Sequence, residues 1–529
     1  MGGPACCSDS YDTFSRKGRI LMETLNIMKN FLTALIIGTA FTTLHAQPNS
    51  YPFTLISKVR EANPRVVALS IDAGKELLLN WRLEKAFSVN AELLPVKSYA
   101  GDLIANSAAA KAPRTISKAY TSAKPEVGSP SQGRYVIIEM DAEDFNASSW
   151  YAGFNPGFRQ MIPYQEKMVY EVKLLQELNY FAANSSPKQP GAMVETLKPN
   201  VVFRQAGARI ATADDFAQGV FDMAQNTDIK SIAYRFYKPI AMAAGAKVPL
   251  VVFLHGSGQS HDYDHFPSDL AADTLSPLFA NQGGVTWVEN APEKAFVLVP
   301  QVPARDTTDA AGEQGWRSAD TQKLLLGLVD KLVAENPAID TDRLYLTGLS
   351  LGAMGSWKIL MNPDAAISRK FAAAVLVAGI PKDVFSSAPA NETPTQKQAR
   401  ILPDLQSMDY RQVAVPLWLV HANTDPAVDR AGARVPFAAL TDKARVDASG
   451  ELLASAGILK QSSPLVRYYE APNRTSGSEV RYTEYQFDAG DRFRDLGMVT
   501  RNAHFSWEAA FKDQAMINWM FAQSKRARR

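Results

Sequence analysis

Beyond about residue 226, the chain alternates short, almost continuously apolar runs with a segment of helical periodicity. The apolar runs occupy residues 248–256, 294–303, 342–348, 371–379 and 415–422. Such runs are typical of parallel strands that other layers cover on both faces. Between the second and third run, residues 320–337 place apolar side chains on one helix face and end at Asn336-Pro337. This alternation predicts an α/β fold with a doubly wound, mostly parallel sheet.

Residues 47–225 follow a different pattern. Runs rich in Val, Ile and Tyr lie at residues 65–74, 86–94, 133–142 and 167–175, between stretches rich in Gly, Pro, Ser and Asn. Strands at this spacing, with few helices, predict an all-β antiparallel sandwich. Residues 211–225 are expected to form a connector with some helical character. Because 529 residues are too many for one ordinary domain, we expect two, at 47–225 and 226–529.

The N-terminal segment has the pattern of an export signal. From Met28 the sequence has one lysine, an uncharged apolar run, and then Ala46 before Gln47. The run is too short for a comfortable membrane span, and a buried helix is the alternative. We expect residues 1–46 to comprise an over-long start and a signal peptide at about 28–46, cleaved after Ala46. The mature protein would then be secreted or periplasmic.

Composition argues against several functional classes. The two cysteines, Cys6 and Cys7, both precede the expected signal. The mature chain would therefore have no disulfide, no thiolate nucleophile and no cysteine-ligated metal. The net charge of +2 lacks the basic surplus that is usual in nucleic-acid-binding proteins. We expect neither a nucleic-acid partner nor a stable membrane span.

A single serine lies between two glycines in the segment 342–360, which reads DRLYLTGLSLGAMGSWKIL. A serine in a sharp strand-to-helix turn is lifted clear of the sheet, and glycines two residues away relieve the crowding there. Gly348 and Gly352 have this spacing around Ser350. The N-terminus of the following helix favours negative charge beside the serine oxygen. The segment therefore predicts Ser350 as a nucleophile, with a glycine-rich turn and a capping serine as the alternative.

A serine hydroxyl needs a general base at neutral pH, and the chain has six histidines. His255 and His421 lie at the ends of predicted strands and are expected to make structural hydrogen bonds. His504 lies in a loop that leads into the last predicted helix. The base occupies this late position when the chain order is nucleophile, acid, base. We predict His504 as the base, and the alternative is a surface histidine that caps the final helix.

The acid should follow a strand between the serine and the histidine. Asp425 comes directly after the apolar run 415–422, and Asp429 follows one helical turn later. We predict Asp425 as the acid and Asp429 as the second choice. The alternative is an Asp-Pro turn without a catalytic role.

Two backbone N–H groups are expected to stabilise a negatively charged oxygen at this site. One belongs to Leu351, directly after the serine. The other should come from the glycine-rich loop FLHGSGQS at 253–260, where Ser257 is the first choice and Gly256 the second. A phosphate-binding loop is the competing interpretation, but no lysine follows at the required spacing.

Residues 261–266, HDYDHF, resemble a metal-binding cluster. The serine chemistry needs no metal, and a polar loop also explains the cluster, so we predict no metal and no other cofactor. Trp316, Trp507 and Gln301 are the predicted substrate-binding residues. For the two tryptophans, ordinary core packing is the alternative.

The chain carries, in this order, the motifs FLHGSGQ, VLVPQVP followed by GW, TGLSLGAMGSW, LWLVHANTDPAV and AHFSWEAAF. With these motifs in this order, it resembles a family of secreted α/β-hydrolases often labelled predicted peptidases. These enzymes are similar to polyhydroxybutyrate-depolymerase-like and feruloyl-type esterases. Some members have an N-terminal immunoglobulin-like domain, which RTISKAYTS and GRYVIIEM resemble. The likeness covers about 226–525 with strong motifs and 60–200 with weaker ones.

The resemblance implies that Ser350, Asp425 and His504 form a catalytic triad in an α/β-hydrolase domain that follows an immunoglobulin-like module. Two departures from the family pattern are visible. After the serine the family usually reads Met-Gly-Gly, whereas this chain has Leu-Gly-Ala, which should trim the pocket without disabling the nucleophile. The first loop often has Glu where Gln259 stands.

The sequence as a whole predicts a secreted serine hydrolase, specifically a carboxylesterase that works through an acyl-enzyme. A serine peptidase with the same triad is the nearest alternative. A surface- or polysaccharide-binding protein with a vestigial hydrolase domain is the alternative of another class. The expected partner is a small-molecule or polymer-linked ester. We further expect a polysaccharide or cell-surface contact through the N-terminal domain, and a contact of that domain with the active-site mouth.

Overall fold

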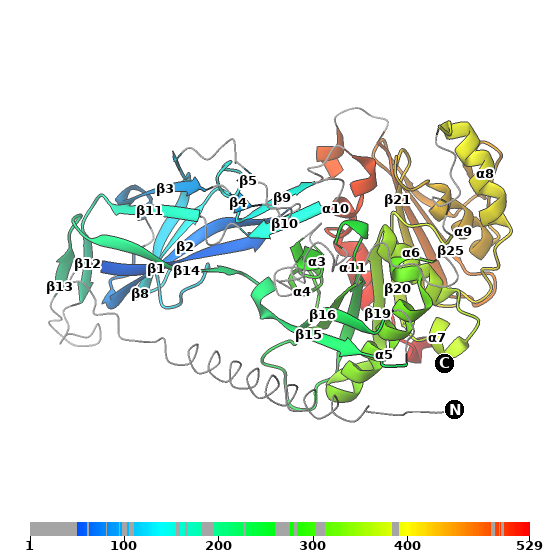
Figure 1. Cartoon of the computed structure of the whole chain (residues 1–529), viewed down its shortest axis with the longest axis horizontal. Coiled ribbons are helices and arrows are strands. Elements are labelled where there is room, and N and C mark those ends of the chain that lie inside the picture. Colours follow the sequence, from blue (N-terminus) through cyan, green and yellow to red (C-terminus); the bar gives the residue numbers. More distant parts are fainter. Residues whose placement is uncertain are drawn as a thin grey trace, which may run out of the picture.

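The computed structural model consists of an all-β part and a larger part in which helices cover a central sheet (Figure 1). The structure describes residues 50–60, 63–80, 82–94, 96–97, 103–104, 111–154, 159–163, 168–181, 194–225, 229–259, 276–279, 283–302, 313–382, 384, 391–487, 492–496, 498 and 502–528. The expected signal segment and the cluster at 261–266 lie outside these ranges.

The N-terminal part is a sandwich of two sheets. The larger sheet runs β13 (Val194–Leu197), β12 (Leu178–Phe181), β2 (Pro64–Leu77), β1 (Ser50–Val59), β14 (Val202–Ile210), with β8 (Gly133–Met140) on β2 and β7 (Ile116–Ser122) on β8. The smaller sheet is β11 (Met168–Leu174), β3 (Phe87–Leu93), β6 (Ala112–Pro113). Two further pairs are β4 (Val96–Lys97) with β5 (Leu103–Ile104) and β9 (Trp150–Phe154) with β10 (Arg159–Pro163).

Alternating burial explains why these segments form a sandwich. Along β3, every second side chain from Phe87 to Leu93 is buried, and β11 repeats the pattern from Met168 to Leu174. The inward-facing side chains of both sheets form one apolar core. The predicted all-β sandwich is confirmed, with one difference: β1 and β14 pair in parallel.

The connector between the two parts is a strand, and the expected helical character of residues 211–225 is wrong. Only a short turn, η2 (Ala213–Asp215), is helical there, and β15 (Phe216–Asp222) follows at once. β15 pairs along its whole length with β16 (Ser231–Tyr237). This pairing satisfies the backbone of β15, so the second sheet begins inside the segment that the sequence assigned to the connector.

The central sheet of the larger part runs β15, β16, β18 (Phe296–Gln301), β17 (Val248–Leu254), β19 (Ile339–Leu349), β20 (Ala373–Val377), β21 (Leu417–Ala422), β26 (Glu479–Tyr485), β25 (Val466–Pro472), β24 (Leu459–Ser462). The strands from β18 to β26 pair in parallel, and the outer ones are antiparallel. The predicted doubly wound, mostly parallel sheet is confirmed.

Helices cover both faces of this sheet. One apolar core lies beneath α5 (Ala319–Glu335), α6 (Leu351–Leu360) and α9 (Ala431–Thr441). The other lies beneath α3 (Ser276–Phe279), α4 (Thr286–Glu289), α10 (Trp507–Ala510) and α11 (Gln514–Phe521). Successive residues of β17 alternate between the two cores: Leu250 and Val252 face the first, Val251 and Phe253 the second. Both faces being buried explains the unbroken apolar runs in the sequence.

Smaller elements extend this frame. They are α7 (Ala365–Ser368), α8 (Pro394–Gln406) and the pair β22 (Ala444–Val446) and β23 (Leu452–Ala454). Within the described ranges, no helix combines the length and apolarity needed to cross a membrane. The two parts of the chain touch directly, since Val59 and Ile210 of the sandwich join the second core and Thr212 Oγ1 donates to Glu289 Oε1 at 2.7 Å.

Candidate active site

Ser350 occupies the turn between β19 and α6. Its φ of +50° and ψ of −118° lie in a region that residues with a side chain rarely adopt. Its N–H donates to the carbonyl of Val377 at 2.9 Å, which ties the turn to the neighbouring strand β20. The strained residue is thus held by the sheet, as expected for a serine presented at the end of a strand.

The two glycines beside Ser350 are required by close backbone contacts. A Cβ on Gly352 would lie 2.0 Å from the carbonyl oxygen of Leu254 on β17. A Cβ on Gly348 would lie 2.7 Å from the carbonyl carbon of Gly352. Glycine therefore lets α6 start directly against the sheet, with its N-terminus beside Ser350.

His504 connects the serine to a carboxylate. It lies in the 3₁₀ turn η7 (Ala503–Phe505), whose start is capped by Asn502: Oδ1 accepts from the His504 N–H at 3.0 Å. The imidazole Nε2 is 3.1 Å from Ser350 Oγ, and Nδ1 is 2.8 Å from Asp425 Oδ2. With Nδ1–H donating to the carboxylate, Nε2 is free to accept the serine proton.

The side chain of Asp425 is fully buried and accepts hydrogen bonds from several donors. It follows β21, and its Oδ1 accepts from the backbone N–H of Ala427 at 2.8 Å and of Val428 at 2.9 Å. Burial acts to raise the pKa of Asp425, but hydrogen bonding with the imidazoles of His421 and His504 outweighs it and holds this pKa well below its usual range. The carboxylate therefore stays ionised beside His504.

The second-choice acid has a different contact. Asp429 Oδ1 accepts from the Ala431 N–H at 2.8 Å, at the start of α9. Of the two aspartates, Asp425 is the one whose contact with His504 the structure describes. The catalytic roles of Ser350, His504 and Asp425 stay predictions.

The two strand-end histidines make structural hydrogen bonds, as expected. His255 Nε2 accepts from the Val302 N–H at 3.1 Å, and Nδ1 lies 2.6 Å from the Gly256 carbonyl. Burial lowers the pKa of His255 to about 4, although its hydrogen bond to Gly256 opposes the shift. His421 Nε2 lies 3.0 Å from the Val428 carbonyl. What the sequence missed is that His421 also approaches Asp425.

The loop after β17 lies next to the serine. A Cβ on Gly256 would be 3.6 Å from Ser350 Cβ, so the backbone of this loop faces the serine. Ser257 is exposed and begins the short turn η3 (Ser257–Gln259). Leu351 opens α6 on the other side of Ser350. Leu351 and Gly256 thus lie beside the serine and Ser257 follows Gly256 directly, while the role of their N–H groups with a substrate stays a prediction.

The predicted substrate-binding residues lie close to the site but are buried. Trp316 is 0% exposed and donates from Nε1 to the His255 carbonyl at 2.9 Å, which favours the core-packing alternative for this residue. Trp507 packs edge-on against the His504 ring at 5.0 Å. Gln301 Nε2 donates to the Gln259 carbonyl at 2.9 Å, so it supports the loop rather than facing solvent.

No group of three or more potential metal ligands occurs among the residues that the structure describes. The cluster at 261–266, the one place where the sequence pattern suggests a metal, lies outside them.

Comparison with known proteins identifies the N-terminal part. Residues 52–185 match the family model of the esterase immunoglobulin-like N-terminal domain. This all-β part of the chain is therefore similar to the immunoglobulin-like domain that precedes the catalytic domain in esterases of that family. No protein with a curated description matches the sequence.

The fold of most of the chain is similar to that of a solved esterase structure. A structure described as a thermostable esterase matches with a TM-score of 0.56 and 23% identity, over 89% of this chain and 99% of that one. This match shows an α/β-hydrolase fold preceded by an immunoglobulin-like domain. An acylaminoacyl peptidase of Pyrococcus horikoshii matches at 13% identity, over 87% of this chain and 70% of that one, with a TM-score of 0.34. An S-formylglutathione hydrolase of Agrobacterium tumefaciens matches at 12% identity, over 58% of this chain and 95% of that one, with a TM-score of 0.31. With TM-scores of 0.34 and 0.31, the last two matches are too weak to support a conclusion about this chain.

Proposed function

We propose that the protein is a serine hydrolase, specifically a carboxylesterase, with Ser350 as nucleophile, His504 as general base and Asp425 as its acid partner. One observation carries the proposal: His504 makes contacts of 3.1 Å to Ser350 Oγ and 2.8 Å to Asp425 Oδ2 at the same time. Both distances are within hydrogen-bond reach, which is the geometry that general-base activation of a serine requires.

In the first half of the reaction, His504 Nε2 accepts the hydroxyl proton while Ser350 Oγ bonds to the carbonyl carbon of the ester. The carbonyl oxygen becomes negatively charged and is stabilised by backbone N–H groups, those of Leu351 and of the loop at Ser257 or Gly256. The imidazolium then protonates the alcohol oxygen, the ester bond breaks, and an acyl-enzyme remains. In the second half, water replaces the alcohol and releases the carboxylic acid.

Asp425 acts on the histidine. Its buried carboxylate keeps Nδ1 protonated and stabilises the positive charge that His504 gains. The N-terminus of α6 complements this arrangement, because its partial positive charge lies on the side where the oxyanion forms.

The esterase-type immunoglobulin-like domain and the esterase fold support an ester as the substrate. The same groups can cleave amides, so a peptidase is the rival that an assay has to separate. We also propose that the protein is exported, which rests on the signal-like segment 28–46 alone.

The test is labelling of the purified full chain by a fluorophosphonate, which reacts with an activated serine. We expect wild-type protein to be labelled and Ser350→Ala not to be. Ser356→Ala is the matched control, since Ser356 is a buried serine on the same helix whose Oγ donates to the Gly352 carbonyl at 2.9 Å. Failure of correctly folded wild-type protein to label contradicts the proposal and favours the binding-protein alternative.

A panel of aryl esters and matched aryl amides then separates the two hydrolase classes. We expect the esters to be cleaved faster at equal concentration. An amide rate equal to or above the ester rate assigns the protein to the peptidases.

A further inference from the structure

A second imidazole lies against the turn that presents the acid. His421 is on β21, four residues before Asp425, and its side chain is fully buried. Its Nε2 is 3.0 Å from the Val428 carbonyl and 3.3 Å from Asp425 Oδ2. Asp425 Oδ2 is therefore approached by two imidazoles, since His504 Nδ1 lies 2.8 Å from the same oxygen.

The hydrogen-bond partners of His421 define its tautomer. Both atoms near Nε2 are oxygens that only accept, so Nε2 must carry the hydrogen. Nδ1 is buried and has no hydrogen-bond partner among the described residues. An N–H group left without a partner in such a place is costly, whereas a bare ring nitrogen is tolerated more easily. The arrangement thus fits a neutral imidazole that donates from Nε2 towards Asp425 and Val428.

The Nε2–H group of His421 links the two ends of the turn from Asp425 to Val428. The N–H of Val428 donates to Asp425 Oδ1 at 2.9 Å, while the carbonyl of Val428 lies 3.0 Å from His421 Nε2. Val428 is thereby held through both of its backbone polar groups. A rotation of the Asp425 carboxylate away from His504 would disturb the contacts on both of its oxygens.

We propose that His421 is a positioning residue, which holds the turn from Asp425 to Val428 so that the Asp425 carboxylate faces His504. The inference rests on the proposed function, because it assigns His421 a role only if Asp425 and His504 act in catalysis.

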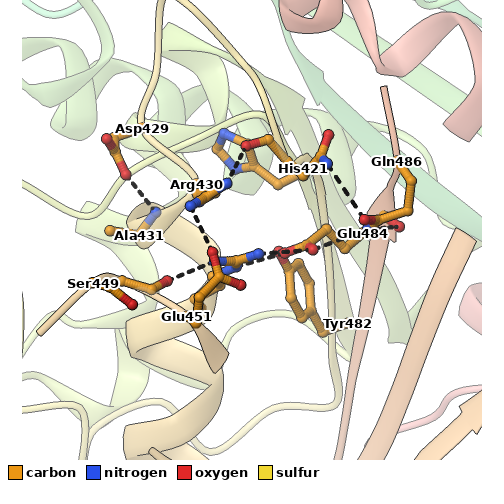
Figure 2. A network of polar contacts seen from close by, with 12 residues as sticks. His421, Asp429, Arg430, Ala431, Ser449, Glu451, Tyr482, Glu484 and Gln486 are labelled. Carbon is orange, nitrogen blue, oxygen red and sulfur yellow. Dashed lines mark hydrogen bonds and ion pairs between the residues drawn. The ribbon is translucent and has the colours of Figure 1, made fainter. Parts of the chain in front are cut away.

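Other groups fix the ends of the acid loop without touching its carboxylate. Arg430 Nη1 donates to the Asn423 carbonyl at 2.8 Å, and its Nη2 is 2.8 Å from Glu451 Oε1. Asn423 Oδ1 accepts from the Phe487 N–H at 2.8 Å. Figure 2 shows Arg430 reaching Glu451 near His421, with Glu484 of β26 in the same network. These contacts anchor the loop, whereas His421 contacts the carboxylate itself, on the oxygen that His504 also contacts.

Two amide variants of His421 test the proposal. Glutamine can bring an N–H to about the place of imidazole Nε2, whereas asparagine has the same chemistry but is shorter by one methylene group. Both replace a buried ring by an amide, so their effects on folding should be similar. We expect His421→Asn to lower kcat by about 10- to 100-fold with KM nearly unchanged, and His421→Gln to restore kcat to within about threefold of wild type.

Thr483→Val is the control for loss of a buried hydrogen bond in the same region. Thr483 Oγ1 accepts from Trp418 Nε1 at 2.9 Å, between β26 and β21. We expect Thr483→Val to keep wild-type kcat. The measurements are kcat and KM on an aryl ester, the rate of fluorophosphonate labelling, and the unfolding temperature of every variant.

The outcomes separate this proposal from the proposed function. If wild-type protein hydrolyses the ester and His421→Asn keeps wild-type kcat, only the positioning role is overturned. Equal losses in the Asn and Gln variants, in step with their unfolding temperatures, also overturn it, because that is the result of a merely structural role. If wild-type protein shows neither hydrolysis nor labelling, the proposed function and this inference both fail.

Discussion

Replacing Asp425 by asparagine should nearly abolish hydrolysis, because neither orientation of the new amide fits the donors around it. Oδ1 accepts from the N–H groups of Ala427 and Val428 at 2.8 and 2.9 Å. An amide NH₂ in that place would face two donors and lose both hydrogen bonds. The NH₂ group should therefore take the place of Oδ2, beside His504.

In that orientation the asparagine acts on the histidine in the wrong sense. The NH₂ donates to Nδ1 of His504, so the ring carries its hydrogen on Nε2. An Nε2–H that points to Ser350 Oγ across 3.1 Å cannot accept the serine proton. A wrong tautomer of this kind costs about 10⁴-fold in kcat, which is about 5 kcal/mol of activation free energy at about 1.4 kcal/mol for each factor of ten.

The assay is kcat on an aryl ester, with active serine counted by fluorophosphonate titration. Asp429→Asn is the matched control, since Asp429 carries the same charge four residues later and its Oδ1 contacts Ala431 N at 2.8 Å. We expect the control to stay within about threefold of wild type. The reasoning is refuted if Asp425→Asn keeps more than about a tenth of wild-type kcat, or if Asp429→Asn causes the larger loss.

Two further predictions concern stability. Gly352→Ala should lower the free energy of unfolding by about 3 kcal/mol or more, because its Cβ would lie 2.0 Å from the Leu254 carbonyl oxygen. Gly207→Ala, with nothing within 4 Å of the new Cβ, should be tolerated, and equal effects of the two variants on the urea midpoint would contradict the argument. Glu484→Gln should destabilise the protein by about 3 kcal/mol at pH 7, since it leaves the buried Arg434, now 2.6 Å from Glu484, without its main charge partner. Burial alone would raise the pKa of Glu484, but Arg434 lowers it from 4.5 to about 2. A carboxyl group whose pKa is lowered on folding stabilises the protein at pH values above its ordinary pKa, and this contribution is lost as the pH falls towards the pKa in the folded state. The urea midpoints of wild type and Glu484→Gln should therefore converge as the pH falls from 4.5 towards 2. A gap between the two midpoints that stays constant over this range would contradict the assignment.

Much of the fold could be predicted because its signals are local. The apolar run 342–348 became part of β19, and the run 415–422 contains β21, since both faces of the sheet are buried. The helix predicted at 320–337 is α5, Ala319–Glu335, which Ser318 caps by accepting from the Thr321 N–H. In each case the residues that indicate the structure lie within the element or directly next to it.

The features that the sequence did not reveal concern segments whose structure depends on distant partners. In the connector, residues 216–222 form a strand because they pair with β16, and this pairing is not visible in their own sequence. The burial of Trp316 depends on α6: a Cβ on Gly355 would lie 2.3 Å from Trp316 Cβ, so helix and ring are in close contact. The pairing of Arg434 with Glu484 joins residues that are 50 positions apart, and neither has a local signal. Long-range packing of this kind cannot be derived from periodicity.

The site lies between these cases. The sharp turn at Ser350 could be predicted because close backbone contacts there require the two nearby glycines. The contact between His504 and Asp425 could be predicted only from the order of these residues along the chain, since nothing within their own segments fixes its length of 2.8 Å. The contact between His421 and Asp425 had one local signal, because His421 precedes Asp425 by four residues. The prediction of a structural role for His421 rested on its place at a strand end and did not consider this spacing.

Strand order explains why the proposed acid lies after β21. β19 and β21 are separated in the sheet by β20 alone, and neighbouring strands lie about 4.8 Å apart. The ends of β19 and β21 are therefore about 10 Å apart, a gap that one imidazole can bridge with hydrogen bonds of 3.1 and 2.8 Å at its two nitrogens. An acid at the end of β20 would be too close, because the Val377 carbonyl there already accepts from the Ser350 N–H at 2.9 Å. Asp429 lies one turn further from β21, just ahead of α9, which begins at Ala431. The turn directly after β21 is thus the position from which a carboxylate can meet a histidine that also reaches Ser350.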